Sequence, residues 1–201
     1  AGQLMHDKFI CISNPAMLHF KPEGKPDFDR AVDKIHKYIN GSLTNAAVFG
    51  DYKGIINTKD ALKYLQEVLN NAEGYVAWDT ETTCLYPRDG YVLGLSISYK
   101  DKQGAYISTD CLDDECIDLL EQLIVKFDAV FHNMKFDIKM IEYHLGVRFN
   151  RSRVHDTMLL HYALDENDSH GLKQLALKYT DYGDYDSELD AFKKQYCAQN
   201  G

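Results

Sequence analysis

Short apolar runs alternate with segments of helical periodicity along this chain, and that alternation limits the folds it can adopt. Apolar runs typical of strands occur at residues 8–13, 52–57, 75–79, 91–99, 104–108 and 129–131. Apolar residues at helical spacing mark 28–39, the segment that follows Thr58, 113–127, the segment that follows Asp137, 156–163 and 172–179. Because several strands come first and strand and helix then alternate, we predict an α/β fold with a mixed sheet flanked by helices.

Composition narrows the class of protein. The 201 residues are 45% hydrophobic and 26% charged, which suits a soluble globular domain. No run of about 18 apolar residues is present, so we expect no membrane-spanning helix. The N-terminus has no basic segment followed by a long apolar one, which argues against secretion. Five scattered cysteines indicate reduced thiols in a cytosolic protein.

The net charge argues against one kind of nucleic-acid binding. The chain has 22 basic and 31 acidic residues, for a net charge of −9. A protein that coats nucleic acid neutralises phosphates with Lys and Arg, and this composition disfavours that class. An enzyme that approaches phosphates through divalent metals remains compatible, because the metals supply the positive charge.

The first candidate site lies where the run at 75–79 ends, in the sequence WDTET. Alternate residues of a strand point to the same face, so Asp79 and Glu81 would place two carboxylates together. Two buried like charges are costly unless a cation neutralises them, and magnesium and manganese prefer carboxylate oxygens. The pattern is short, so the alternative that one acid caps a turn and the other is solvated stays open.

The second candidate is the segment HNMKFD, which follows the short strand at 129–131. Asp137 falls on the apolar edge of the first turn of the next helix. It is either a third carboxylate at the metal site or an acid that stabilises the helix N-terminus. Asn133 either caps that helix or binds a ligand, and in isolation capping is favoured. Asp156 is similarly expected to cap the helix after it rather than to bind metal.

Together the segments WDTETTCL, HNMKFD and HDTMLLHYALDENDSHGLKQLALKY resemble a known family in their order and spacing. They are similar to the 3′→5′ proofreading exonuclease domain of family A DNA polymerases, in the DEDD superfamily with a ribonuclease H-like fold. The resemblance covers residues 52–179 and has a phage-like style. It implies an exonuclease-like domain at 51–201, with 1–50 as an N-terminal accessory segment or subdomain.

The resemblance also implies roles for individual residues. Asp79, Glu81 and Asp137 match the acids that bind two Mg²⁺ or Mn²⁺ ions and catalyse hydrolysis of the 3′-terminal phosphodiester, releasing nucleoside monophosphates. On the substrate side it implies Thr82, Asn133 and Leu85, the last against the terminal base. The implied partners are the 3′ end of single-stranded DNA and a polymerase domain in the same parent chain, with no membrane. The implied location is the cytoplasm of a bacterium or a phage-infected cell.

The third motif of that superfamily departs from the expected pattern. Tyr182 and Asp186 have the right spacing, but they lie in a polar stretch containing glycine, with no apolar periodicity around them. We therefore expect the chain to be a fragment that stops before the true third motif, with weak metal binding and poor activity.

Two alternative functions remain open at this point. A ribonuclease D-like RNA exonuclease would use the same chemistry, because these motifs do not distinguish the substrate sugar. A non-catalytic nucleic-acid-binding domain that kept the fold would explain the poor third motif, although the intact acids at 79, 81 and 137 argue against it.

Overall fold

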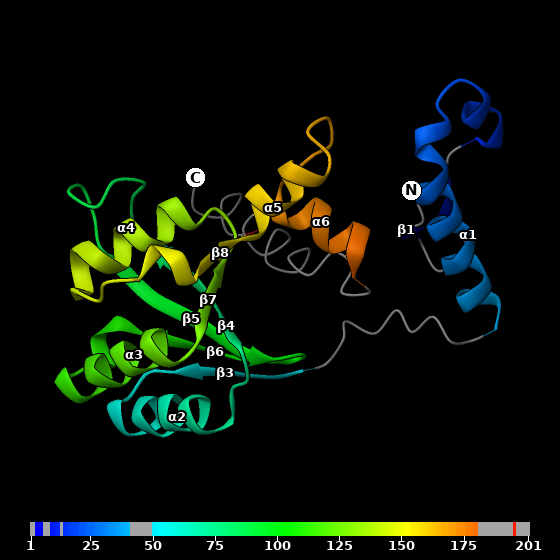
Figure 1. The fold of residues 1–201 in the computed structure, drawn as a ribbon. Coiled ribbons are helices and arrows are strands. Elements are labelled where there is room, and N and C mark those ends of the chain that lie inside the picture. Colours follow the sequence, from blue (N-terminus) through cyan, green and yellow to red (C-terminus); the bar gives the residue numbers. More distant parts are fainter. Residues whose placement is uncertain (1–2, 6–8, 13, 41–49, 181–194, 196–201) are drawn as a thin grey trace. The chain divides into compact units, whose positions relative to one another are not determined.

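The computed structural model describes residues 3–5, 9–12, 14–40, 50–180 and 195 (Figure 1). Contacts group the chain into two units. One consists of Ala1–Val48 with Lys173–Gly201, and the other is Phe49–Leu172. The candidate residues that the structure describes all belong to the second unit.

The described part of the first unit contains a short hairpin and two α-helices. Strands β1 (Gln3–Met5) and β2 (Phe9–Cys11) pair antiparallel. Two 3₁₀ turns, Pro15–His19 and Pro22–Gly24, lead into helix α1 (Lys25–Ile39). The apolar pattern placed the start of this helix at residue 28, but the helix begins at Lys25, since a proline is tolerated in the first turn. Helix α6 (Leu172–Tyr179) has the predicted bounds.

The second unit is built on a mixed six-stranded sheet. Its strands are β3 (Asp51–Ile55), β4 (Tyr75–Thr82), β5 (Val92–Lys100), β6 (Gln103–Ser108), β7 (Asp128–Phe131) and β8 (Val154–Asp156). They lie in the order β3-β6-β5-β4-β7-β8. Strand β5 is antiparallel to both neighbours, and the other pairs are parallel. The predicted mixed α/β sheet is confirmed.

Four helices complete this unit: α2 (Thr58–Asn71), α3 (Asp114–Lys126), α4 (Met134–Leu145) and α5 (Thr157–Leu164). The apolar pattern placed α2 after Thr58, whereas the helix includes Thr58 and its cap is Asn57. The side chain of Asn57, not that of Thr58, accepts a hydrogen bond from Asp60 N at 3.0 Å. Asp113 caps α3 in the same way, through Cys116 N at 2.9 Å.

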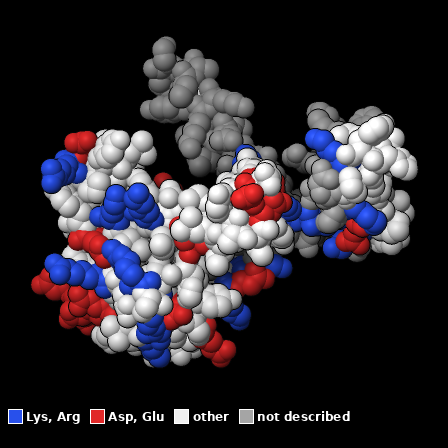
Figure 2. Space-filling view, turned by 45° about the horizontal axis from the view of Figure 1, so that its top comes forward, with Lys and Arg blue, Asp and Glu red and all other residues white. Residues whose placement is uncertain are grey.

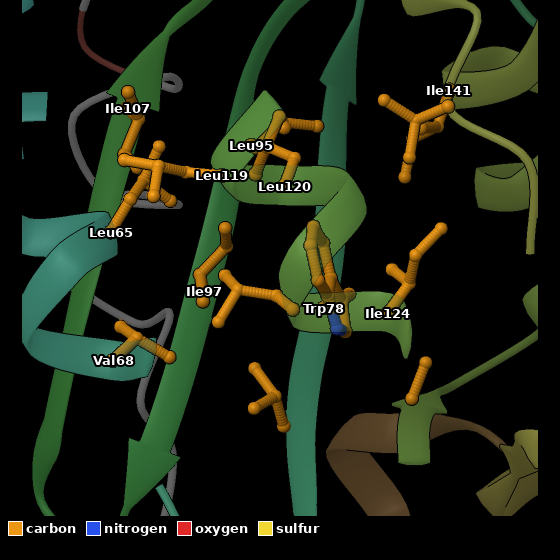
Figure 3. Packing of buried hydrophobic residues seen from close by; sticks show 14 of the residues in the cluster. Leu65, Val68, Trp78, Leu95, Ile97, Ile107, Leu119, Leu120, Ile124 and Ile141 are labelled. Carbon is orange, nitrogen blue, oxygen red and sulfur yellow. The ribbon is translucent and has the colours of Figure 1, made fainter. Parts of the chain in front are cut away.

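One face of the sheet forms the core. Along β4, Val76, Trp78 and Thr80 are buried, whereas the alternate residues are exposed. Figure 3 shows side chains of α2, α3 and α4 packed around Trp78 and its neighbours on β5 and β6. The Trp78 ring also meets Phe149 edge-on, with centroids 5.6 Å apart. The opposite face of β4 therefore remains available for polar residues.

Two expectations from composition can be compared with the described part of the chain. Cys84, Cys111 and Cys116 are free thiols. Among the described helices, none is long and apolar enough to cross a membrane. On the face shown in Figure 2, acidic and basic side chains are interspersed rather than separated into large areas of one sign.

Candidate active site

Asp79 and Glu81 lie on strand β4 itself. The sequence suggested that the strand would end at Asp79, but it continues to Thr82 because its pairing with β5 continues past the acids. Asp79 lies opposite Ser96 and Glu81 opposite Gly94, and the register shifts after Glu81. Both acids are exposed on the same face of the strand, as the alternation predicted.

Asp137 approaches β4 from the first turn of α4. It is only 3% exposed. Its Oδ1 accepts hydrogen bonds from Thr80 N at 3.1 Å and from Thr80 Oγ1 at 2.7 Å. Thr80 stands between the two acids of β4, so these bonds tie the helix acid to the strand at the candidate site.

The carboxyl groups of Asp79 and Asp137 have raised pKa values, so their ionised forms would be stabilised by a nearby positive charge. Burial, with a smaller contribution from the negative charge of Asp79, raises the pKa of Asp137 to about 6, although the hydrogen bond from the Thr80 hydroxyl acts in the opposite direction. Burial also raises the pKa of Asp79, although solvent reaches part of this residue. A cation bound between them would stabilise both ionised forms.

Glu81 is the second acid of β4 and lies opposite Gly94 of β5. Its charge acts on Tyr106, whose pKa is raised by burial and, to a lesser degree, by the charge of Glu81. Gly94, opposite Glu81, leaves the space that the Tyr106 ring fills, since a Cβ there would lie 2.3 Å from that ring. Among the described residues, no three acidic, histidine or cysteine side chains are placed to share a metal ion.

Two of the three expected substrate-side residues line one pocket, and the third does not. Leu85, which is 75% exposed, and Asn133 line the same pocket between the loop after β4 and helix α4. The pocket has a volume of about 210 Å³. Thr82 is not among its lining residues, and its hydroxyl donates to Cys84 O at 3.0 Å within the loop.

The expectation that Asn133 caps α4 is wrong. Asn133 occupies the cap position in the left-handed conformation, with φ of 67°, and its side chain makes no capping bond. The carboxylate of Asp156 caps the helix instead, accepting from Asn133 N at 3.1 Å and from Met134 N at 2.9 Å. The amide of Asn133 is thereby left exposed at the pocket.

Asp156 also caps α5, as predicted. Its Oδ1 accepts from Met158 N at 2.9 Å and from Leu159 N at 3.3 Å. The residue is buried, and its carboxylate thus holds four backbone N–H groups from two helices. This bonding gives Asp156 a structural role.

The structure adds residues that sequence reasoning missed. His132 follows β7 directly, and its Nδ1 lies 2.9 Å from Thr157 Oγ1. Burial lowers its pKa, and the charges of Asp156 and Asp79 oppose that shift. Tyr86, Lys135 and Lys139 line the pocket beside Leu85. The four-residue spacing of the two lysines was a readable signal, because it places both on one face of the helix.

Tyr182 and Asp186, the candidate third motif, lie outside the described residues. The structure therefore carries no information on where these two side chains lie relative to the acids.

Comparisons with known proteins agree with this architecture. The sequence model of the 3′–5′ exonuclease domain of family A DNA polymerases matches residues 54–200. The DNA polymerase of Escherichia phage T5 is 50% identical over 196 residues, which are 94% of this chain and 23% of the polymerase. DNA polymerase I of Borreliella burgdorferi is 34% identical over 133 residues, 62% of this chain and 14% of that protein.

This chain belongs to the 3′–5′ exonuclease family of DNA polymerases of family A. It spans less than a quarter of the length of these two relatives. The catalytic core of RRP6 from Trypanosoma brucei has the same type of fold, with a TM-score of 0.55 at 18% identity over 66% of this chain and 35% of that one. The expected ribonuclease H-like fold is confirmed, and the family is one that generally depends on divalent metals.

Proposed function

We propose that this chain removes nucleotides from the 3′ end of single-stranded DNA and proofreads for a DNA polymerase. The observation that carries the proposal is the pair of carboxylates at Asp79 and Asp137, linked through Thr80 at the end of β4. Membership of the exonuclease family supports this interpretation. The reaction would cleave the last phosphodiester and release a nucleoside monophosphate.

The donor set fits hard divalent cations. Asp79, Glu81 and Asp137 would hold Mg²⁺ or Mn²⁺ through carboxylate oxygens, which these ions prefer. The raised pKa values of Asp79 and Asp137 support the fit, because two crowded carboxylates become more stable beside a cation. When bound, a pair of such ions activates water and stabilises the leaving oxygen.

The chain's own residues position these groups and the substrate. Thr80 donates two hydrogen bonds to Asp137 Oδ1 and so fixes the direction of that carboxylate. Leu85 presents an exposed apolar side chain to the terminal base, and Asn133 presents its amide beside it. Thr82 acts indirectly, because its hydroxyl donates to Cys84 O and so holds the loop that carries Leu85.

The wider setting of the domain is part of the same proposal. Residues 51–201 would form the exonuclease-like domain and 1–50 an accessory segment or subdomain. A polymerase domain in the same parent chain is supported by the small share of its polymerase relatives that this chain covers. Those relatives come from a phage and a bacterium, which supports action in the cytoplasm of a bacterium or a phage-infected cell.

A gel assay with 5′-labelled single-stranded DNA and Mn²⁺ tests the proposal. At the high protein concentration that the expected poor activity calls for, wild type should shorten the strand from its 3′ end, and Asp79→Ala and Asp137→Asn should not. Asp118→Asn is the matched control, because Asp118 is an exposed acid of α3 away from β4. It should cleave as wild type does.

Three results would contradict the proposal. If Asp79→Ala cleaved the strand as fast as wild type, Asp79 would have no role in the reaction. Failure of wild type to bind Mn²⁺ in calorimetry and to cleave would favour a non-catalytic domain. Faster degradation of a matched RNA strand would favour an RNA exonuclease.

A further inference from the structure

We propose that Tyr106 is a positioning residue for the metal site, whose ring limits the directions that the Glu81 side chain can take and keeps its carboxylate beside the other two acids. This inference rests on the proposed function, because it takes Glu81 to be a metal ligand. Tyr106 lies on β6, two strands away from β4 in the sheet, and no motif of the sequence pointed to it.

Glu81 has no side chain opposite it on β5. Its partner in the pairing of β4 with β5 is Gly94, whereas Asp79 lies opposite Ser96. Opposite residues on one face of a sheet are normally close enough for their side chains to touch. The glycine therefore leaves a gap beside Glu81, into which a long and flexible side chain would be free to turn.

Tyr106 fills that gap from the far side of β5. Strand β5 lies between β4 and β6, and Tyr106 is paired with Ser96, two residues along the strand from Gly94 (Figure 1). Its ring leans diagonally, so that a Cβ on Gly94 would lie 2.3 Å from Cζ and 2.5 Å from the hydroxyl oxygen. The outer end of the ring thus covers the residue that lies opposite Glu81.

The charge of Glu81 is felt at this ring. The pKa of the Tyr106 phenol is raised, first by burial and then by the negative charges of Glu81 and Asp110. A raised pKa keeps the phenol neutral, so the ring occupies the gap without adding a negative charge beside the acids.

Other restraints on Glu81 are few. Asp137 is fixed by two hydrogen bonds from Thr80. Glu81 is exposed, and its carboxylate forms no hydrogen bond or ion pair with the residues that the structure describes. The Tyr106 ring is therefore a restraint on the acid of β4 that lacks polar ones.

The side of β4 away from β5 is open at this point. The pairing of β4 with β7 ends at Ala77, four residues before Glu81. Because the N–H groups of a strand point sideways within the sheet, Asp137, which accepts from Thr80 N, lies on this open side. With the gap at Gly94 filled, the open side is the direction left to the Glu81 carboxylate, and it leads toward Asp137.

The affinity for Mn²⁺, titrated by calorimetry at high protein concentration, tests the inference. Tyr106→Ala should weaken binding about 3- to 10-fold, because Glu81 regains rotamers that it must lose when it binds the ion. Tyr106→Phe keeps the ring and should bind as wild type does.

Tyr52→Ala is the matched control. Tyr52 of β3 also lies beside a glycine of β6, since a Cβ on Gly104 would be 3.7 Å from its ring. Gly104 is two residues from Tyr106, so the two tyrosines share a face of the sheet, but β6 and β5 separate Tyr52 from β4. This variant should keep the wild-type affinity.

Two further variants distinguish positioning from a general loss of structure, with urea denaturation to verify that each protein is folded. Gly94→Ala keeps the phenol but displaces the ring, and it should weaken Mn²⁺ binding even if Tyr106→Ala does not fold. In a Glu81→Gln background, Tyr106→Ala should have no further effect, because the ring acts through the carboxylate.

The outcomes separate this inference from the proposed function. Wild-type affinity in both Tyr106→Ala and Gly94→Ala, with weaker binding by Glu81→Gln, would overturn the inference alone. An equal loss from Tyr106→Ala with and without Glu81→Gln would do the same. Weaker Mn²⁺ binding as expected, in a wild-type protein that does not shorten DNA, would contradict the proposed function and keep the positioning role. Absence of Mn²⁺ binding by wild type would contradict both.

Discussion

The two faces of strand β4 differ in almost every physical respect, although they alternate residue by residue. One face presents Val76, Trp78 and Thr80 to the core, and the other presents Asp79 and Glu81 to solvent. The first face stabilises the sheet against three helices, and the second carries crowded negative charge. The residues of β4 that stabilise the fold and those proposed to carry out the reaction therefore lie on opposite faces of one strand.

Thr80 is the residue at which the two faces meet. It points into the core, yet its hydroxyl and amide both hold the carboxylate of Asp137. Substitutions on each face should therefore have distinct signatures in stability, in its pH dependence and in activity, and Thr80 should combine them.

The largest loss of stability is expected from the core face. Trp78 is 4% exposed and packs edge-on against Phe149. Trp78→Ala should lower the free energy of unfolding by about 3–5 kcal/mol, because it leaves a cavity where a large ring was buried. Urea denaturation measures this. A loss below about 1 kcal/mol would mean that the core face does not depend on this ring.

The pH dependence of stability should reveal the acidic side. The pKa of Asp137 rises from 3.8 to about 6 on folding, so the folded state binds more protons than the unfolded state between these values. Stability without metal should therefore fall as pH rises through this window, by on the order of 3 kcal/mol in total. Denaturation curves at pH 4 and pH 7 in EDTA measure the change.

Asp137→Asn isolates that effect from the other titrating groups. The variant should lack this part of the pH dependence, so its difference from wild type should grow as pH rises. Parallel profiles for the two proteins would show that Asp137 titrates normally in the folded state.

Thr80→Val should have a smaller effect that combines both faces. The substitution keeps the shape and removes the hydroxyl that donates to Asp137 Oδ1 at 2.7 Å. Stability at pH 7 should fall by about 1.5 kcal/mol, since a hydrogen bond to a charged group is lost, and by less at pH 4. Equal losses at both pH values would assign the effect to packing alone.

The smallest effect on stability is expected from Asp79→Ala, with the opposite sign. Removing one of two crowded carboxylates should leave the melting temperature unchanged or raise it slightly in EDTA, while abolishing nuclease activity. Thermal unfolding and the gel assay measure the two outcomes. A large drop in melting temperature would give Asp79 a structural role and break the contrast between the faces.

Local patterns predicted most of the fold, and the errors have physical causes. The bounds of α6 and most of β5 and β6 follow from apolar periodicity. Strand β8 was missed because it has three residues and is stabilised only by parallel pairing with β7. The end of β4 was placed early because its last residues are polar and are held by pairing with β5.

The contacts of the candidate site could not be predicted where they join residues that are distant in the sequence. The alternation of β4 correctly placed Asp79 and Glu81 on one face, and the bonds from Asp156 to its own helix were expected from local capping rules. The capping of α4 by Asp156 joins residues more than twenty positions apart, so no local pattern reveals it. The same applies to the bonds between Thr80 and Asp137.

The double cap at Asp156 has a mechanical consequence. One carboxylate bonds to the first N–H groups of α4 and of α5, so the two helix ends cannot separate without losing hydrogen bonds at both. Helix α4 carries Asp137 and both pocket lysines. The positions of Asp137 and of the two lysines therefore both depend on one carboxylate, that of Asp156, which belongs to neither group.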